Sequence, residues 1–237
     1  RTPLSAIKWS LKMVLDGDLG KPTPEMEEFI NKSYTTNERM IRLVNDLLNV
    51  SRIEEGRFFY KFKPLNIIEF MNGMVLDFIP LCKDKKIAIN WKAPKEKLPL
   101  IQGDTDHLRL AIQNLLDNAL KYTPINGTIT ISLGKAKIGN GILLQVIDSG
   151  VGIPEEEQKR IFSKFFRGTN VVKMQTDGSG LGLFIVKNII ERHEATISFD
   201  SSKKGTTFSI IFPPTKNMEK EDKDHEGETF QRFITQF

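Results

Sequence analysis

Two asparagines, Asn114 and Asn118, stand four residues apart in the run NLLDNALKYTP at 114–124. In a helix, side chains at i and i+4 lie above one another, so the two amides form a polar column beside the leucines of the same run. An amide oxygen is a hard, neutral ligand of the kind that Mg²⁺ accepts. For a lone pair of asparagines, two buried amides bonded to the backbone would be the better explanation, so the neighbouring motifs decide.

Three further motifs follow in order, DSGVGIP (148–154), IFSKFFRG (161–168) and DGSGLGL (177–183). Glycines ahead of a helix expose N–H groups at the positive end of the helix dipole, so the last run could cradle phosphates, although a simple loop is the commoner explanation. Asp148 could accept the exocyclic amine of an adenine, or form an ordinary Asx turn. Arg167 could reach a γ-phosphate, or be solvated. Four such motifs in sequence favour a site for Mg²⁺ and ATP.

The elements that must position these motifs begin with two helices. Apolar residues at a mean spacing of about 3.5 predict one helix that ends at the turn 16–24 and a second that continues to about residue 55. Two helices joined by a short turn form a hairpin, which buries such a seam poorly by itself. We therefore expect a homodimer that forms a four-helix bundle; the alternative is a monomeric hairpin packed on the next domain.

The chain changes to mixed helix and strand patterns from about residue 63. Helical patterns cover 66–84, 104–122 and 180–193, and strand patterns cover 87–91, 128–133, 142–148, 195–200 and 206–212. Interleaving of this kind predicts an α/β sandwich, with one sheet covered on one face by helices. We expect three regions, namely a helical hairpin (1–62), an α/β domain (63–213) and a polar linker with a short amphipathic C-terminal segment (214–237).

Composition limits the classes of protein that fit. Of the 237 residues, 39% are hydrophobic and 27% are charged, and the net charge of +4 is too small and scattered to indicate a nucleic-acid partner. The single cysteine, Cys82, excludes an internal disulfide framework and fits a reducing compartment. No run approaches the roughly 20 apolar residues of a membrane span. We expect a cytoplasmic location.

The order of the four motifs resembles the N, G1, F and G2 boxes of the sensor histidine kinases of two-component systems. The opening run RTPLSAI resembles the end of the family's H box, His-Glu-Leu-Arg-Thr-Pro-Leu, so the resemblance spans roughly residues 1–213. It implies a dimerisation and phosphotransfer hairpin followed by an ATP-binding domain of the Bergerat type.

The resemblance also assigns roles to single residues. Asn118 would ligate Mg²⁺, Asn114 would help to hold the ion and the phosphates, and Lys121 would approach the phosphates. Residues 163–178 would form a lid, with Arg167 at its phosphate end. Asn114, Lys121 and Arg167 would serve the reaction, and Thr2 could orient a water in a phosphatase reaction. The implied nucleotide-binding set is Asn114, Asn118, Lys121, Tyr122, Asp148, Gly150, Gly152, Phe166, Arg167, Gly178, Gly180, Leu181, Gly182 and Thr206.

The sequence departs from the family pattern at two places. The family's phosphoacceptor histidine lies three residues before the arginine that is Arg1 here, and the chain contains only His107, His193 and His225. We expect that histidine to precede Arg1 in a longer protein, with a sensor or membrane region further upstream. The run ERHEATISFD (191–200) also lacks the His-Gly-Gly that the family commonly has after its last helix.

The expected function is that of an ATP-dependent protein-histidine autokinase, which passes its phosphoryl group to an aspartate of a response-regulator receiver and could also act as the regulator's phosphatase. Two alternatives stay open. An ATP hydrolase of the same nucleotide-binding superfamily would carry a glutamate as general base where Asn114 stands, and Asn cannot take up a proton. A dimeric scaffold could bind nucleotide without chemistry.

Overall fold

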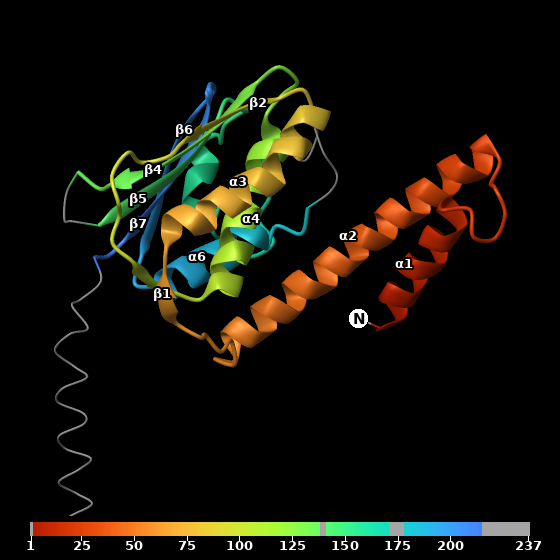
Figure 1. The fold of residues 1–237 in the computed structure, drawn as a ribbon, viewed down its shortest axis with the longest axis horizontal. Helices are drawn as coiled ribbons and strands as arrows, with labels where there is room; N and C mark the ends of the chain where they lie inside the picture. The colour runs from red at the N-terminus through yellow and green to blue at the C-terminus, as the bar shows by residue number, and fades with distance from the viewer. Residues whose placement is uncertain (1, 138–140, 171–177, 215–237) are drawn as a thin grey trace, which may run out of the picture.

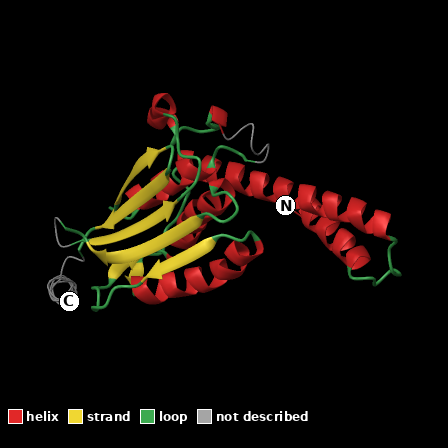
Figure 2. Cartoon of the chain, turned by 90° about the horizontal axis from the view of Figure 1, so that it is seen from above, coloured by secondary structure: helices red, strands yellow, loops and turns green. Residues whose placement is uncertain are grey.

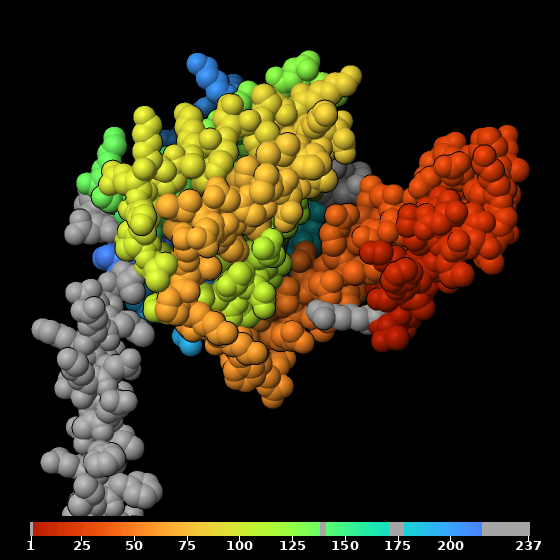
Figure 3. Space-filling model, viewed as in Figure 1, coloured from red at the N-terminus to blue at the C-terminus, as the bar shows by residue number. Residues whose placement is uncertain are grey.

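A helical hairpin precedes an α/β domain in the chain, and the hairpin stands out from that domain as an arm (Figures 1 and 3). The coordinates are a computed structural model that describes residues 2–137, 141–170 and 178–214. The expected C-terminal amphipathic segment and residues 171–177 of the expected lid lie outside the described residues. Within that described part, no helix is both long and apolar enough to cross a bilayer.

The hairpin consists of α1 (Thr2–Leu15) and α2 (Pro24–Glu54). Helix α2 begins where the Thr23 hydroxyl accepts a hydrogen bond from Met26 N at 3.3 Å, with proline in the first turn. The buried side chain of Asn37 donates to the carbonyl of Leu4 at 2.9 Å and ties α2 to α1. Large apolar side chains of the hairpin are nevertheless exposed, by 43–75%: Ile7, Trp9, Met13, Leu19, Met26, Phe29 and Met40.

The α/β domain contains a five-stranded sheet of strand order β2-β4-β5-β7-β6. Strand β2 pairs parallel with β4, and the remaining neighbours pair antiparallel. The strands are β2 (Ala88–Lys92), β4 (Thr128–Lys135), β5 (Ile142–Asp148), β6 (Thr196–Ser202) and β7 (Gly205–Phe212). A separate two-stranded antiparallel sheet joins β1 (Lys63–Leu65) to β3 (Ile101–Gly103).

Three helices cover one face of the large sheet, α3 (Ile67–Asp84), α4 (Thr105–Tyr122) and α6 (Gly182–Arg192) (Figure 2). Because successive side chains of a strand point to opposite faces, Ile129, Ile131 and Leu133 of β4 enter the core while the residues between them are more exposed. A short 3₁₀ helix, η1 (Glu155–Arg160), follows β5. The expected helical hairpin and α/β sandwich are confirmed.

All five expected strands are present, with bounds within two residues of the expected ones. Strands β1 and β3 were not expected. Each contains only three residues, too few to show an alternating pattern.

Candidate functional site

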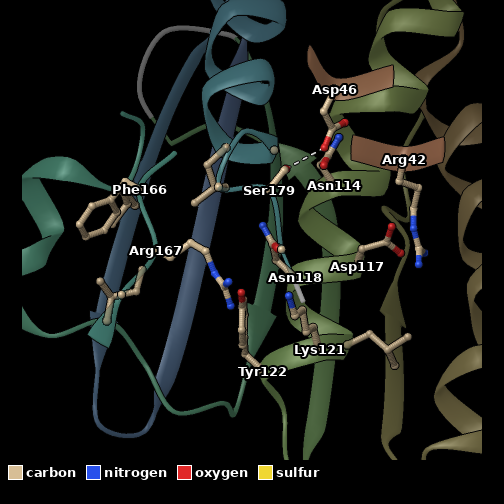
Figure 4. Close-up of a pocket in the computed structure, with 18 of the residues that line it drawn as sticks. Arg42, Asp46, Asn114, Asp117, Asn118, Lys121, Tyr122, Phe166, Arg167 and Ser179 are labelled. Atoms are coloured by element: carbon tan, nitrogen blue, oxygen red, sulfur yellow. Dashed lines mark hydrogen bonds between the residues drawn. The ribbon is translucent and has the colours of Figure 1, made fainter. Parts of the chain in front are cut away.

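A cavity of about 680 Å³ opens between α4, the loops after β5 and η1, the glycine loop before α6, and α2 (Figure 4). It collects side chains from each of the four sequence motifs. The expected nucleotide-binding residues that line it are Asn114, Asn118, Lys121, Tyr122, Asp148, Gly152, Phe166, Arg167, Gly178, Gly180, Gly182 and Thr206.

Helix α4 supplies the polar column. The helix begins at Asp104, whose carboxylate accepts from the backbone N–H groups of Asp106 and His107 at 3.1 and 3.0 Å. Leu115 and Leu116 are buried against the sheet, with at most 1% exposed, while Asn114 and Asn118 line the cavity. The amphipathic pattern of the run therefore places both amides on the cavity side of one helix.

Asn114 has a fixed orientation. Its amide nitrogen donates to the carbonyl of Leu110 at 2.9 Å, which turns its oxygen toward the start of α6. A Cβ placed on Gly182 would lie 2.6 Å from that oxygen, Asn114 Oδ1. The absence of a side chain at Gly182 thus leaves room for the Asn114 amide at the end of the glycine loop.

Asp148 forms one end of the cavity. Its Oδ1 accepts from Gly150 N at 2.8 Å and from Thr206 N at 3.3 Å, and the Thr206 hydroxyl is bonded to that of Ser201 at 2.8 Å. Burial raises the pKa of Asp148 above its usual value, against the opposing effect of the two backbone hydrogen bonds. A Cβ on Gly152, where φ is +66°, would lie 1.8 Å from the carbonyl oxygen of Ser202, so this turn admits only glycine.

Two cationic side chains converge at the other end of the cavity. A Cβ on Gly178 would lie 3.0 Å from Lys121 Nζ and 3.6 Å from Arg167 Nε, so both cations border the glycine loop. The loop leads into α6, whose N-terminus adds partial positive charge. The cavity therefore has a carboxylate at one end and concentrated positive charge at the other.

Helix α2 closes one side of the cavity. Its Asp46 carboxylate accepts from the Ser179 hydroxyl of the glycine loop at 2.8 Å, and Asp117 of α4 points toward Arg42 of α2 (Figure 4). Burial raises the pKa of Asp46 and of Asp117. The sequence pattern does not predict this wall, because the periodicity of a helix indicates a packed face without identifying what packs against it.

The comparisons with known proteins agree with this geometry. The family described as "Histidine kinase-, DNA gyrase B-, and HSP90-like ATPase" matches residues 103–216, and "His Kinase A (phospho-acceptor) domain" matches residues 1–56. The chain belongs to the histidine kinase family.

Among curated relatives, the sensor histidine kinase WalK of Bacillus subtilis (strain 168) is 29% identical over 92% of the chain and 36% of its own length. The autoinducer 2 sensor kinase/phosphatase LuxQ of Vibrio vulnificus (strain CMCP6) is 34% identical over 79% of the chain and 22% of its own length. The chain thus spans about a third or less of these relatives. The crystal structure of full-length ShkA in complex with AMPPNP matches 90% of the chain and 43% of its own, with a TM-score of 0.72 and 26% identity.

Two histidines, His193 and His107, hold the linker between α2 and β1 (residues 55–62). His193 is buried; its Nε2 accepts from Asp104 N at 3.0 Å, so its Nδ1 carries the proton toward the carbonyl of Ile189. The Asp104 carboxylate accepts from Lys61 N at 2.6 Å, and the ring of Tyr60 in the linker lies 4.5 Å from that of His107. Burial lowers the pKa of His193. These contacts explain both histidines as structural.

Three expected site residues lie outside the cavity lining. Gly150 N donates to Asp148, and a Cβ there would lie 2.8 Å from the carbonyl oxygen of Tyr122. Leu181 is fully buried in the core. Thr2 is the first residue of α1, in the hairpin.

Other cavity residues were missed from the sequence. Glu157, Asn170 and Ser179 line it, together with the side chains of α2. Glu157 stands in a run of three glutamates that reads as a solvated surface, and no spacing distinguishes it from the other two.

Proposed function

We propose that this chain is the catalytic part of an ATP-dependent protein-histidine kinase. It binds ATP with Mg²⁺ in the α4 cavity, and the phosphoryl group goes first to a hairpin histidine and then to an aspartate of a response-regulator receiver. Family membership over both regions supports the reaction class, and the AMPPNP bound to ShkA, which is similar over 90% of the chain, supports the nucleotide.

The observation that carries the proposal is the amide at Asn114. An ATP hydrolase needs a base beside the γ-phosphate to activate water, and a carboxamide cannot take up a proton. The Asn114 amide is held by Leu110 with its oxygen at the glycine loop, so this position can act as a ligand and not as a base. The geometry therefore favours transfer to a protein side chain over hydrolysis.

The donor set fits a magnesium ion. Asn114 and Asn118 offer neutral oxygens on one helix face, and Mg²⁺ prefers a few hard oxygen ligands together with waters and phosphate oxygens. When bound, the ion would neutralise phosphate charge during transfer. We assign Asn118 as its ligand and Asn114 as a supporting residue.

The remaining residues bind and orient the nucleotide. Asp148 accepts the adenine amine, with Thr206, Gly150 and Gly152 shaping that end, and Tyr122 packs beside the base. Lys121 and Arg167 hold the phosphates at the glycine loop, and the proximity of both side chains to Gly178 supports this assignment. Catalysis by this set is positioning and charge stabilisation, the usual form for phosphoryl transfer.

We further propose that the hairpin dimerises through the apolar side chains exposed on α1 and α2, which a second copy would cover in a four-helix bundle. LuxQ, whose name includes a phosphatase, is similar over 79% of the chain. Thr2 on α1 is the candidate residue for a phosphatase reaction on the receiver.

Two measurements test the proposal. Calorimetry of the chain with Mg²⁺ and a non-hydrolysable ATP analogue should show saturable binding, and its absence would refute the nucleotide site. The full-length protein, incubated with γ-labelled ATP, should acquire label that is acid-labile and base-stable, as phosphohistidine is. Release of free phosphate with no protein-bound label would favour the hydrolase instead.

A further inference from the structure

A buried carboxylate beside the cavity has no role in the assignments above. Of the three consecutive glutamates in η1, Glu155 and Glu156 are exposed, whereas Glu157 is only 9% exposed. Its Oε1 accepts from the hydroxyl of Thr169 at 2.7 Å and from Thr169 N at 3.0 Å, and its Oε2 lies 3.2 Å from the same nitrogen. A buried carboxylate is costly unless it is hydrogen-bonded, and Thr169 supplies those bonds.

A second bond lies next to the first. The side chain of Asn170 donates to the carbonyl of Gly152 at 3.0 Å. Residues 169 and 170 are therefore tied to residues 157 and 152 by adjacent side-chain bonds, which together we call the clamp. The clamp joins the segment after the third motif to the turn of the second.

The clamp closes a loop that carries two cavity residues. The residues between Glu157 and Thr169 form a loop that includes Phe166 and Arg167, both of which line the cavity. Within this loop the Arg160 guanidinium lies over the Phe166 ring, 4.9 Å from its centroid. Since Arg167 stands only two residues before Thr169, the position of Thr169 sets where the Arg167 backbone enters the cavity.

We propose that Glu157 is a positioning residue, which acts through Thr169 to hold Arg167 at the phosphate end of the cavity. The inference rests on the proposed nucleotide function. Glu157 does not itself touch the phosphates; it fixes the base of the loop, so that the Arg167 side chain reaches the glycine loop beside Lys121 without first having to be ordered.

The test separates this role from general stability. Thr169→Val removes the hydroxyl bond to Glu157 and keeps the shape of the side chain. A hydrogen bond to a charged group corresponds to a change of at least about tenfold in an equilibrium constant. We assign Arg167 to the γ-phosphate, which ADP lacks. Calorimetry should therefore show affinity for a non-hydrolysable ATP analogue about tenfold weaker, with ADP affinity unchanged.

Four companion variants sharpen the result. Thr169→Ser keeps the hydroxyl and should restore analogue binding. Glu156→Gln changes an exposed neighbour of Glu157 and should have no effect on either nucleotide. In an Arg167→Gln background, Thr169→Val should weaken analogue binding no further, because the residue through which the clamp acts is already gone. Glu157→Gln should act in the same direction as Thr169→Val.

The possible results distinguish the positioning role of Glu157 from the proposed nucleotide function. Analogue-specific loss that depends on Arg167 supports the inference. Equal loss for ADP and the analogue, an additive double variant, or no change on Thr169→Val would each overturn it while leaving the nucleotide site intact. A wild-type chain that binds neither nucleotide would refute the proposed function itself, and the positioning role with it.

Discussion

Gly182 allows a prediction in which folding stability and nucleotide binding respond differently to one substitution. Gly182 is the first residue of α6, and its φ lies outside the left-handed region, so Gly182→Ala imposes no backbone strain. The added methyl group would lie 2.6 Å from Asn114 Oδ1, closer than contact allows. Because that oxygen is the end of a side chain, the Asn114 amide can rotate away, at the cost of its 2.9 Å bond to Leu110.

The two effects on stability nearly cancel. Alanine is favoured over glycine in a helix by up to about 1 kcal/mol, and losing one neutral hydrogen bond costs about 0.5–1.5 kcal/mol. The free energy of unfolding should therefore change by less than about 1 kcal/mol. Affinity for Mg²⁺ and an ATP analogue should fall at least tenfold, because the amide that we assign to the ion and phosphates is displaced.

The control is the same exchange elsewhere in the domain. Gly73 lies within α3, and a Cβ there would meet nothing within 4 Å. Gly73→Ala should raise the free energy of unfolding by about 1 kcal/mol and leave nucleotide binding unchanged. Urea denaturation and calorimetry of both variants provide the measurements. If Gly182→Ala bound the analogue as tightly as the wild type, the argument that Gly182 makes room for the Asn114 oxygen would be wrong.

Three further predictions concern charge, the adenine end and assembly. Burial raises the folded-state pKa of Asp46 above its unfolded value, so the charged carboxylate destabilises the fold at neutral pH, and this penalty disappears on acidification. Asp46→Asn should therefore raise the melting temperature at pH 7 but not at pH 3. An equal shift at both pH values would contradict this. Asp148→Asn should weaken analogue binding at least tenfold in calorimetry without lowering the melting temperature, and unchanged affinity would remove Asp148 from the site. The chain should sediment as a dimer at micromolar concentration, and a monomer there would refute the four-helix bundle.

The sequence predicted the architecture well because the decisive patterns are local. The seam of the hairpin and the alternation of strands such as β4 follow from residue order alone, and the order of the four motifs indicated which loops meet. Most of the nucleotide-binding residues that the resemblance implied line the cavity.

The parts that escaped prediction depend on contacts between distant segments. Nothing in the run of three glutamates distinguishes Glu157, whose burial follows from the placement of Thr169. Asp46 of α2 meets Ser179 only because the hairpin lies against the glycine loop, a contact across 133 residues of sequence. The pairing of His193 with Asp104 likewise spans 89 residues. Periodicity predicts that a side chain faces the core, but it does not predict which residue that side chain contacts.

The placement of α2 against the nucleotide cavity has a thermodynamic consequence. Asp46 of α2 accepts a hydrogen bond from the Ser179 hydroxyl, in the loop that would also bind phosphate. Nucleotide binding and the position of the hairpin would therefore be thermodynamically coupled. Coupling of binding free energies is reciprocal: if moving the hairpin changes nucleotide affinity by some factor, the nucleotide shifts the balance of hairpin positions by the same factor. If the proposed nucleotide site is correct, a displacement of the arm would change ATP affinity even before any phosphoryl group moves.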